Sequence, residues 1–115
     1  MLDHMTFRVS DIQRAKAFYG AALAPLGYTL CYEGHHGVNI VGFAYPDPAE
    51  RDGRKADVWF VDGPSPYGGA PATTACHLAW KAASRAQVDA FHQAAIAAGG
   101  SGCAKPTMFT PWWPS

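Results

Sequence analysis

The chain has 115 residues, of which 49% are hydrophobic and 16% charged, and its formal net charge is zero. This length suits one domain with its own core, and a neutral chain without a cluster of Lys and Arg argues against nucleic-acid binding. Because the apolar runs are short and the start lacks a basic leader, we expect a cytoplasmic protein that does not enter a membrane. Cys31, Cys76 and Cys103 are odd in number and widely spaced, which predicts reduced cysteines.

The first element predicted along the chain is a strand at residues 2–9, where apolar and polar residues alternate. Its two faces would carry Met5, Phe7 and Val9 on the apolar side and His4, Thr6 and Arg8 on the polar side. A helix should come next, because Ser10 and Gln13 match a capping box and Gly27 can end a helix in the left-handed conformation.

Three more strands are predicted at residues 28–33, 38–45 and 56–62. The turn-rich stretches EGHHG and PDPAERDGRK separate them. Residues 1–63 would therefore form a complete βαβββ module. The Gly- and Pro-rich residues 64–74 would link this module to the C-terminal part of the chain.

An internal repeat appears when the chain is shifted over itself by 73 residues, which places His4 on His77. The stretch HMTFRVSDIQRAKAFYGAALAPLG then aligns without a gap to HLAWKAASRAQVDAFHQAAIAAGG. The repeat predicts a second strand at 75–82 with His77 on its polar face. It also predicts a second helix that begins at Ser84 with Gln87 and ends at Gly99 and Gly100.

The chain resembles a known protein family in three stretches. These stretches are LDHMTFRVSDIQRAKAFYGAALAPLGY, ADVWFV and CHLAWKAASRAQVDAFHQAAIAAGG. The chain resembles the vicinal oxygen chelate superfamily, which includes glyoxalase I, bleomycin-resistance proteins and extradiol dioxygenases and is built from paired βαβββ modules. The resemblance implies an α+β fold and a single domain over 1–115. That domain would hold a complete module at 1–63, a linker at 64–74 and a partial module at 75–115.

The resemblance also implies a metal site in a cleft, with His4 and His77 as first-strand ligands and Asp57 as a carboxylate ligand. Such a set suits divalent Fe, Mn, Ni or Zn, and the metal would act as a Lewis acid on substrate oxygens. The alternative is structural: a strand histidine is often simply hydrogen-bonded, and Asp57 could be a water-facing residue at the start of a strand.

Two further residues are predicted to line the cleft. Trp59 would share the face of Asp57 by alternation, although core packing is the alternative for this ring. Arg8 would be a polar cleft residue on the first strand. His35 and His36 should form a solvated hairpin tip, and His92 should lie on a helix surface.

The resemblance leaves two functional hypotheses. The first is a metal-dependent lyase, isomerase or dioxygenase of the glyoxalase type. The second is a metal-free binding module for a drug-like or toxic small molecule, similar to bleomycin-resistance proteins and catalytically inactive. Either would take a small-molecule ligand in the cleft.

The C-terminal stretch PTMFTPWWPS is rich in large apolar side chains, namely Met108, Phe109, Trp112 and Trp113. The 73-residue offset puts the last strands of the second copy beyond residue 115. A partial module would leave an open sheet edge. We therefore expect a homodimer in which this stretch packs on the partner, with folding back over its own sheet as the alternative.

Overall fold

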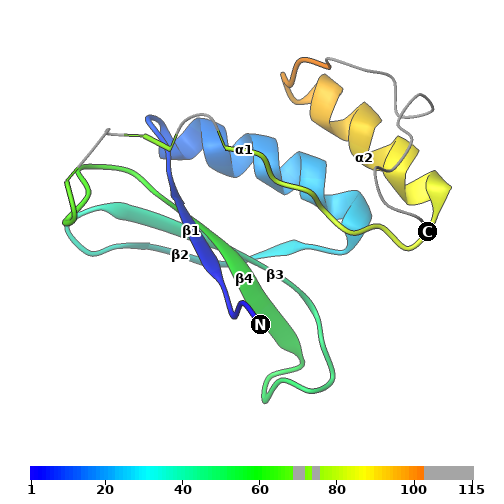
Figure 1. Cartoon of the computed structure of the whole chain (residues 1–115), viewed down its shortest axis with the longest axis horizontal. Coiled ribbons are helices and arrows are strands. Elements are labelled where there is room, and N and C mark those ends of the chain that lie inside the picture. The colour runs from blue at the N-terminus through cyan, green and yellow to red at the C-terminus, as the bar shows by residue number, and fades with distance from the viewer. Residues whose placement is uncertain (69–71, 74–75, 103–115) are drawn as a thin grey trace.

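The computed structural model describes residues 1–68, 72–73 and 76–102. Its elements are β1 (Met5–Arg8), α1 (Ile12–Leu23), the short 3-10 helix η1 (Ala24–Leu26), β2 (Thr29–His35), β3 (Asn39–Pro46), β4 (Arg54–Val61) and α2 (Arg85–Ala97). The α+β class is confirmed, and the first five main elements follow the predicted βαβββ order (Figure 1). The boundaries predicted for the linker and the second module stay predictions.

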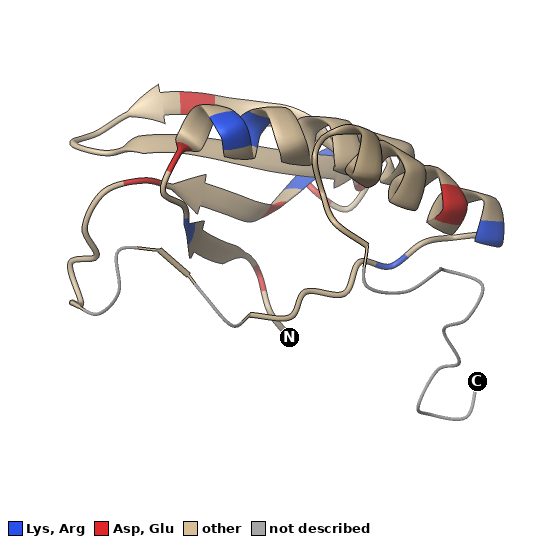
Figure 2. Cartoon of the chain, turned by 90° about the horizontal axis from the view of Figure 1, so that it is seen from above, with Lys and Arg blue, Asp and Glu red and all other residues tan. Residues whose placement is uncertain are grey.

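The four strands form one sheet in the order β1-β4-β3-β2. β1 runs parallel to β4, and the other neighbours are antiparallel, so the chain crosses over through α1 to place its first strand beside its last. α1 lies over one face of this sheet, and Figure 2, seen from above, shows charges of both signs scattered over the elements. Among the described residues, neither helix covers the opposite face of the sheet.

The core lies between α1 and the sheet. Its largest fully buried side chains are Leu23, Phe43, Val58 and Phe60. The Tyr19 ring on α1 stacks on Phe60 with ring centroids 4.1 Å apart. The predicted apolar face of the first strand is also found on this side, since Phe7 and Val9 pack against the buried cluster.

The start of α1 differs from the prediction by one residue. Asp11, not Ser10, is the N-cap, and its Oδ1 accepts hydrogen bonds from the backbone N–H groups of Gln13 (3.0 Å) and Arg14 (3.1 Å). One carboxylate oxygen thus satisfies two free donors and favours negative charge at the helix N-terminus. α1 itself ends at Leu23, and Gly27, with a left-handed φ of 90°, ends the 3-10 helix η1 that follows it.

The start of α2 agrees with the prediction. Ser84 is the N-cap, and its Oγ accepts a hydrogen bond from the Gln87 N–H at 3.2 Å. The Gln87 side chain reaches back and accepts from the Ala83 N–H at 2.6 Å. α2 packs against α1 and η1, although none of its own residues is fully buried.

The predicted strand at 75–82 is wrong for its described part, because residues 76–82 form no strand. The alternation itself is real: Leu78 and Trp80 are half-buried, whereas the residues between and beside them are exposed. Side-chain packing holds this segment, with the Trp80 ring edge-on to Tyr28 at a centroid distance of 5.6 Å. An alternating pattern becomes a strand only where a neighbouring backbone completes the ladder.

The apolar C-terminal residues lie outside the described part of the chain, and so does Cys103. The homodimer therefore stays a prediction. Cys31 and Cys76 are free thiols. Among the described residues, no helix has both the length and the hydrophobicity needed to cross a membrane.

Candidate functional site

The sheet face opposite α1, here called the open face, carries Thr6, Arg8, Tyr32, Gly42 and Trp59. Thr6 pairs with Trp59, Trp59 with Gly42, and Gly42 with Tyr32, so these residues form one row across all four strands. Directly paired residues project from the same side of a sheet. The row therefore brings two aromatic rings and the hydroxyl groups of Thr6 and Tyr32 together on a single surface.

Trp59 is held on the open face by its contact with a glycine. A Cβ atom placed on Gly42 would lie only 2.6 Å from Cζ3 of Trp59, so the ring rests against bare backbone. The indole N–H donates to the Ala56 carbonyl at 3.3 Å. Trp59 remains half-buried, which leaves part of the ring accessible.

Tyr32 stands beside Trp59, with ring centroids 5.7 Å apart and planes tilted by 54°. Its ring also lies against a glycine, because a Cβ on Gly34 would come within 2.8 Å of Cζ. The Tyr32 hydroxyl is 2.6 Å from Nε2 of His36. We call Tyr32 and Trp59 the aromatic pair. Sequence reasoning missed Tyr32, although Gly42 inside the strand predicted at 38–45 is a signal for close approach of a neighbouring group.

Gly42→Ala is expected to lower the free energy of unfolding by about 1–3 kcal/mol, because the new methyl group would overlap the Trp59 ring. The matched control is Gly20→Ala in α1, where a Cβ would meet Phe43 at an ordinary 3.9 Å. There the expected change is a gain of about 0.5–1 kcal/mol from helix propensity. Urea unfolding of both variants checks this, and equal effects of the two substitutions would contradict the contact.

Arg8 lies at the β1 edge of the open face. Its Nη1 donates to the carbonyls of Gly63 (3.0 Å) and Asp62 (3.4 Å). These bonds hold the chain that follows β4 against the side chain. A cavity of about 460 Å³ opens here, and its polar lining consists of Thr6, Arg8, Ser65, Tyr67 and Thr73. Arg8 thus lines a cavity, and its role as a polar residue of a ligand cleft stays a prediction.

Asp57 does not share the face of Trp59, and the alternation predicted for these two residues is wrong. Ala56 pairs with Ala44 and Val58 pairs with Phe43, so Asp57 is an extra residue in a β-bulge. A bulge breaks strict alternation because two residues on one strand face one on the other. The Asp57 side chain instead meets Tyr28, which packs against the core, and its Oδ2 accepts a hydrogen bond from the Tyr28 hydroxyl at 3.1 Å.

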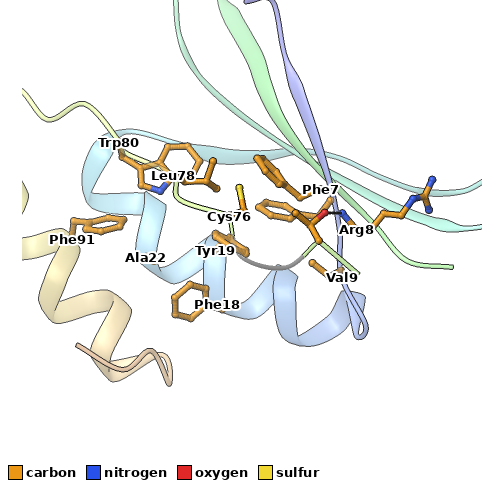
Figure 3. Close-up of a pocket in the computed structure, with 12 residues that line it drawn as sticks. Phe7, Arg8, Val9, Phe18, Tyr19, Ala22, Cys76, Leu78, Trp80 and Phe91 are labelled. Atoms are coloured by element: carbon orange, nitrogen blue, oxygen red, sulfur yellow. Dashed lines mark hydrogen bonds between the residues drawn. The ribbon is translucent and has the colours of Figure 1, made fainter. Parts of the chain in front are cut away.

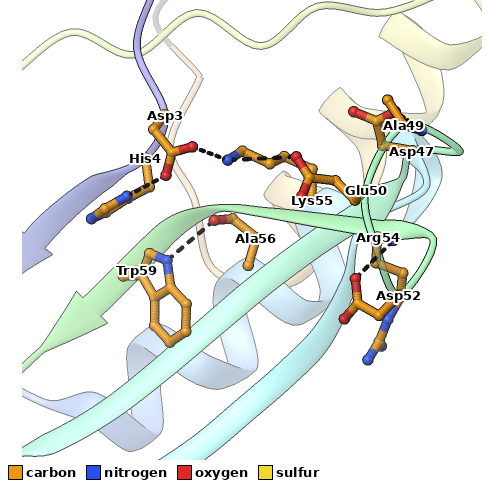
Figure 4. A network of polar contacts seen from close by, with 10 residues as sticks. All are labelled: Asp3, His4, Asp47, Ala49, Glu50, Asp52, Arg54, Lys55, Ala56 and Trp59. Carbon is orange, nitrogen blue, oxygen red and sulfur yellow. Dashed lines mark hydrogen bonds and ion pairs between the residues drawn. The ribbon is translucent and has the colours of Figure 1, made fainter.

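His4 belongs to a surface network at the start of β1. Its Nδ1 lies 2.8 Å from Oδ2 of Asp3, and 56% of its side chain is exposed. Asp3 in turn bonds to Lys55, which lies 3.9 Å from Glu50 (Figure 4). The Lys55 ammonium and the His4 imidazole together hold the pKa of Asp3 below its usual range.

The other histidines lie on separate surfaces. His77 is exposed in the segment before α2. At the β2–β3 hairpin, His35 Nδ1 lies 3.0 Å from Oδ1 of Asn39, and His36 contacts the Tyr32 hydroxyl. His92 is half-buried on α2. The hairpin position predicted for the first two is confirmed.

The predicted metal ligands do not assemble into one site in the part of the chain that the structure describes. No group of three His, Cys, Asp or Glu residues there is arranged to hold a metal ion. Asp57 is turned toward the core by the bulge and already accepts a hydrogen bond from Tyr28. The assignment of His4, Asp57 and His77 as ligands of a divalent metal stays a prediction, and no chemical step is derived through a metal.

A second cavity, of about 350 Å³, lies on the helix side. Its apolar walls come from β1, α1, the segment before α2 and α2 itself: Phe7, Phe18, Tyr19, Leu78, Trp80 and Phe91 (Figure 3). Burial raises the pKa of the Tyr19 hydroxyl in this wall. Figure 3 also shows the Arg8 guanidinium pointing away from this cavity, as its place on the open face requires.

The chain matches a known protein family. Residues 1–109 match the family model described as Glyoxalase/Bleomycin resistance protein/Dioxygenase superfamily. The match spans both the βαβββ module and the segment that carries α2. No curated protein matches the chain.

Proposed function

The chain belongs to the glyoxalase/bleomycin resistance protein/dioxygenase superfamily, and we propose that it binds a flat aromatic small molecule on the open face of its sheet. The observation that carries this proposal is the aromatic pair. Trp59 rests on Gly42 with Tyr32 beside it, and neither ring is fully buried.

The packing of the aromatic pair favours a binding role over a purely structural one. A core tryptophan contributes by burying its whole ring, whereas Trp59 is only half-buried and Tyr32 is 37% exposed. The glycine backbone below and the hydrogen bond to Ala56 fix the Trp59 ring before any ligand arrives. A pre-organised ring loses little conformational entropy on binding, which favours affinity.

The tilt between the two rings indicates the shape of the ligand. With planes at 54°, a planar molecule that stacks on one ring presents its edge to the other. Stacked and edge-to-face contacts are both favourable for aromatic groups. Saturated rings of the same size lack the π-face and fit this arrangement less well.

Naphthol and its fully saturated analogue are suitable probes, and isothermal titration calorimetry measures their affinities. We expect naphthol to bind, and Trp59→Ala to weaken it by about tenfold or more, since stacking on an aromatic side chain contributes roughly 1–3 kcal/mol. Trp59→Phe should keep most of the affinity, and the saturated analogue should bind more weakly than naphthol.

Trp80→Phe is the control for the helix-side cavity, because Trp80 lines that cavity and not the open face. Its expected effect on naphthol affinity is small. Binding that is lost in Trp80→Phe and kept in Trp59→Ala would place the ligand on the helix side and overturn the proposal. Absence of naphthol binding to the parent chain would overturn it as well.

A further inference from the structure

We infer that the ligand of the open face carries an anionic oxygen group, a carboxylate or a phosphate, which Arg8 binds in the cavity beside β1. The inference rests on the proposed function, since it names the chemical class of the ligand taken by the same face. It is carried by the placement of one guanidinium next to the aromatic pair.

Arg8 has no carboxylate partner among the described residues. Both hydrogen bonds of its side chain go to backbone carbonyls, those of Asp62 and Gly63, and both use Nη1. A guanidinium has five N–H donors, so several remain free for a ligand. The nearby Asp62 carboxylate is engaged elsewhere, because its two oxygens accept from the backbone N–H and the side-chain amide of Asn39, each at 2.7 Å.

The cavity around Arg8 offers further donors and no negative charge. Among its described lining residues, Arg8 is the only charged one, and Thr6, Ser65, Tyr67 and Thr73 bring hydroxyl groups. Arg8 is half-buried, which reduces the screening of its charge by water. Arginine binds carboxylate and phosphate groups through two parallel hydrogen bonds, which are stronger than hydrogen bonds between neutral groups.

Thr6 connects this cavity to the aromatic pair. It lines the cavity and is also the β1 partner of Trp59. Arg8 lies two residues further along the same strand and on the same face, so its Cα is about 8 Å from that of Trp59, given ordinary strand spacing and rise. One small ligand can therefore place a ring on Trp59 and an anionic group at Arg8.

The test compares naphthol with naphthoate and with naphthyl phosphate by calorimetry on the full chain at low salt. We expect at least one of the two anions to bind about tenfold more tightly than naphthol, since hydrogen bonds to charged groups are the stronger class. The better anion tells a carboxylate ligand from a phosphate ligand. If naphthol binds and neither anion binds better, the inference fails and the proposed function stands.

Arg8→Gln and Arg8→Lys assign the effect to the guanidinium. Arg8→Gln should abolish the preference for the anion, so that naphthol and the anions bind with similar affinity, whereas Arg8→Lys should keep part of the preference. Because Arg8 also holds the Asp62 and Gly63 carbonyls, Arg8→Gln could loosen this part of the chain. Equal losses for naphthol and for the anion in that variant would show a structural role and overturn the inference.

Discussion

Phe60→Ala is expected to lower the free energy of unfolding by about 3–5 kcal/mol, the range for truncating a buried aromatic residue. Phe60 is 1% exposed and stands at the centre of the core. Its ring centroid lies 4.1 Å from that of Tyr19, 6.0 Å from that of Phe7 and 6.1 Å from that of Phe43. The ring thus joins α1, β1 and β3 to β4, and its loss would leave a cavity bordered by all of them.

Urea unfolding followed by far-ultraviolet circular dichroism measures this loss. Tyr67→Ala is the control, because Tyr67 is 96% exposed and its removal should change stability by less than about 0.5 kcal/mol. A loss below about 1 kcal/mol for Phe60→Ala would mean that the contact between α1 and the sheet does not carry the stability of the fold.

The side of the sheet that packs against α1 could be predicted from alternation alone. Phe7 and Val9 on the first strand, and Val58 and Phe60 on the last, all lie where a period of two residues places them. Burial of apolar side chains dominates at these positions, so local pattern and tertiary structure agree.

The position of Asp57 could not be predicted in this way. A bulge shifts the phase of alternation by one residue, and nothing in the letters ADVWFV marks where the extra residue falls. The bulge becomes visible only through the pairing of Ala56 with Ala44 and of Val58 with Phe43. Tyr32 was not predicted for the candidate site either, because its partner Trp59 lies two strands away in the sheet.

The strand predicted at 75–82 was wrong for a different reason. Its alternating exposure was predicted correctly, but strand structure depends on a hydrogen-bonding neighbour that a local pattern does not contain. The N-cap of α1 is a second feature that the local sequence pattern did not decide, since Asp11 takes this position instead of the predicted Ser10. Serine and aspartate are both good caps, and only the structure shows that Asp11 is the residue whose side chain accepts from Gln13 and Arg14.

Tyr28→Phe is expected to lower the free energy of unfolding by about 1.5–3 kcal/mol, the range for a hydrogen bond to a charged group. The Tyr28 hydroxyl donates to Asp57 Oδ2 at 3.1 Å. The other oxygen, Oδ1, is buried and has no hydrogen-bond partner in the described part of the chain. Removing the hydroxyl would leave the carboxyl group without its side-chain donor in a place that water reaches poorly.

Tyr45→Phe is the matched control. The Tyr45 ring packs edge-on against Tyr28 with a centroid distance of 5.5 Å, but no hydrogen bond of its hydroxyl is found among the described residues. Its removal should therefore change stability by less than about 0.5 kcal/mol. Equal losses for the two variants would show that the hydroxyl-to-Asp57 bond is not the stabilising contact.

The same hydroxyl makes stability depend on alkaline pH. Desolvation, and after it the Asp57 carboxyl, raises the pKa of Tyr28 above its ordinary value of 10.0. The unfolded chain therefore loses this proton at a lower pH than the folded protein does. The contribution of Tyr28 to stability is complete below about pH 10 and is lost progressively as the pH rises further.

Urea midpoints measured from pH 8 to 11 should fall less steeply above about pH 10 in Tyr28→Phe than in the parent chain. Some slope should persist in the variant, because burial raises the pKa of Tyr19 as well. Identical pH profiles for parent and variant would contradict a half-buried, protonated Tyr28 that donates to Asp57.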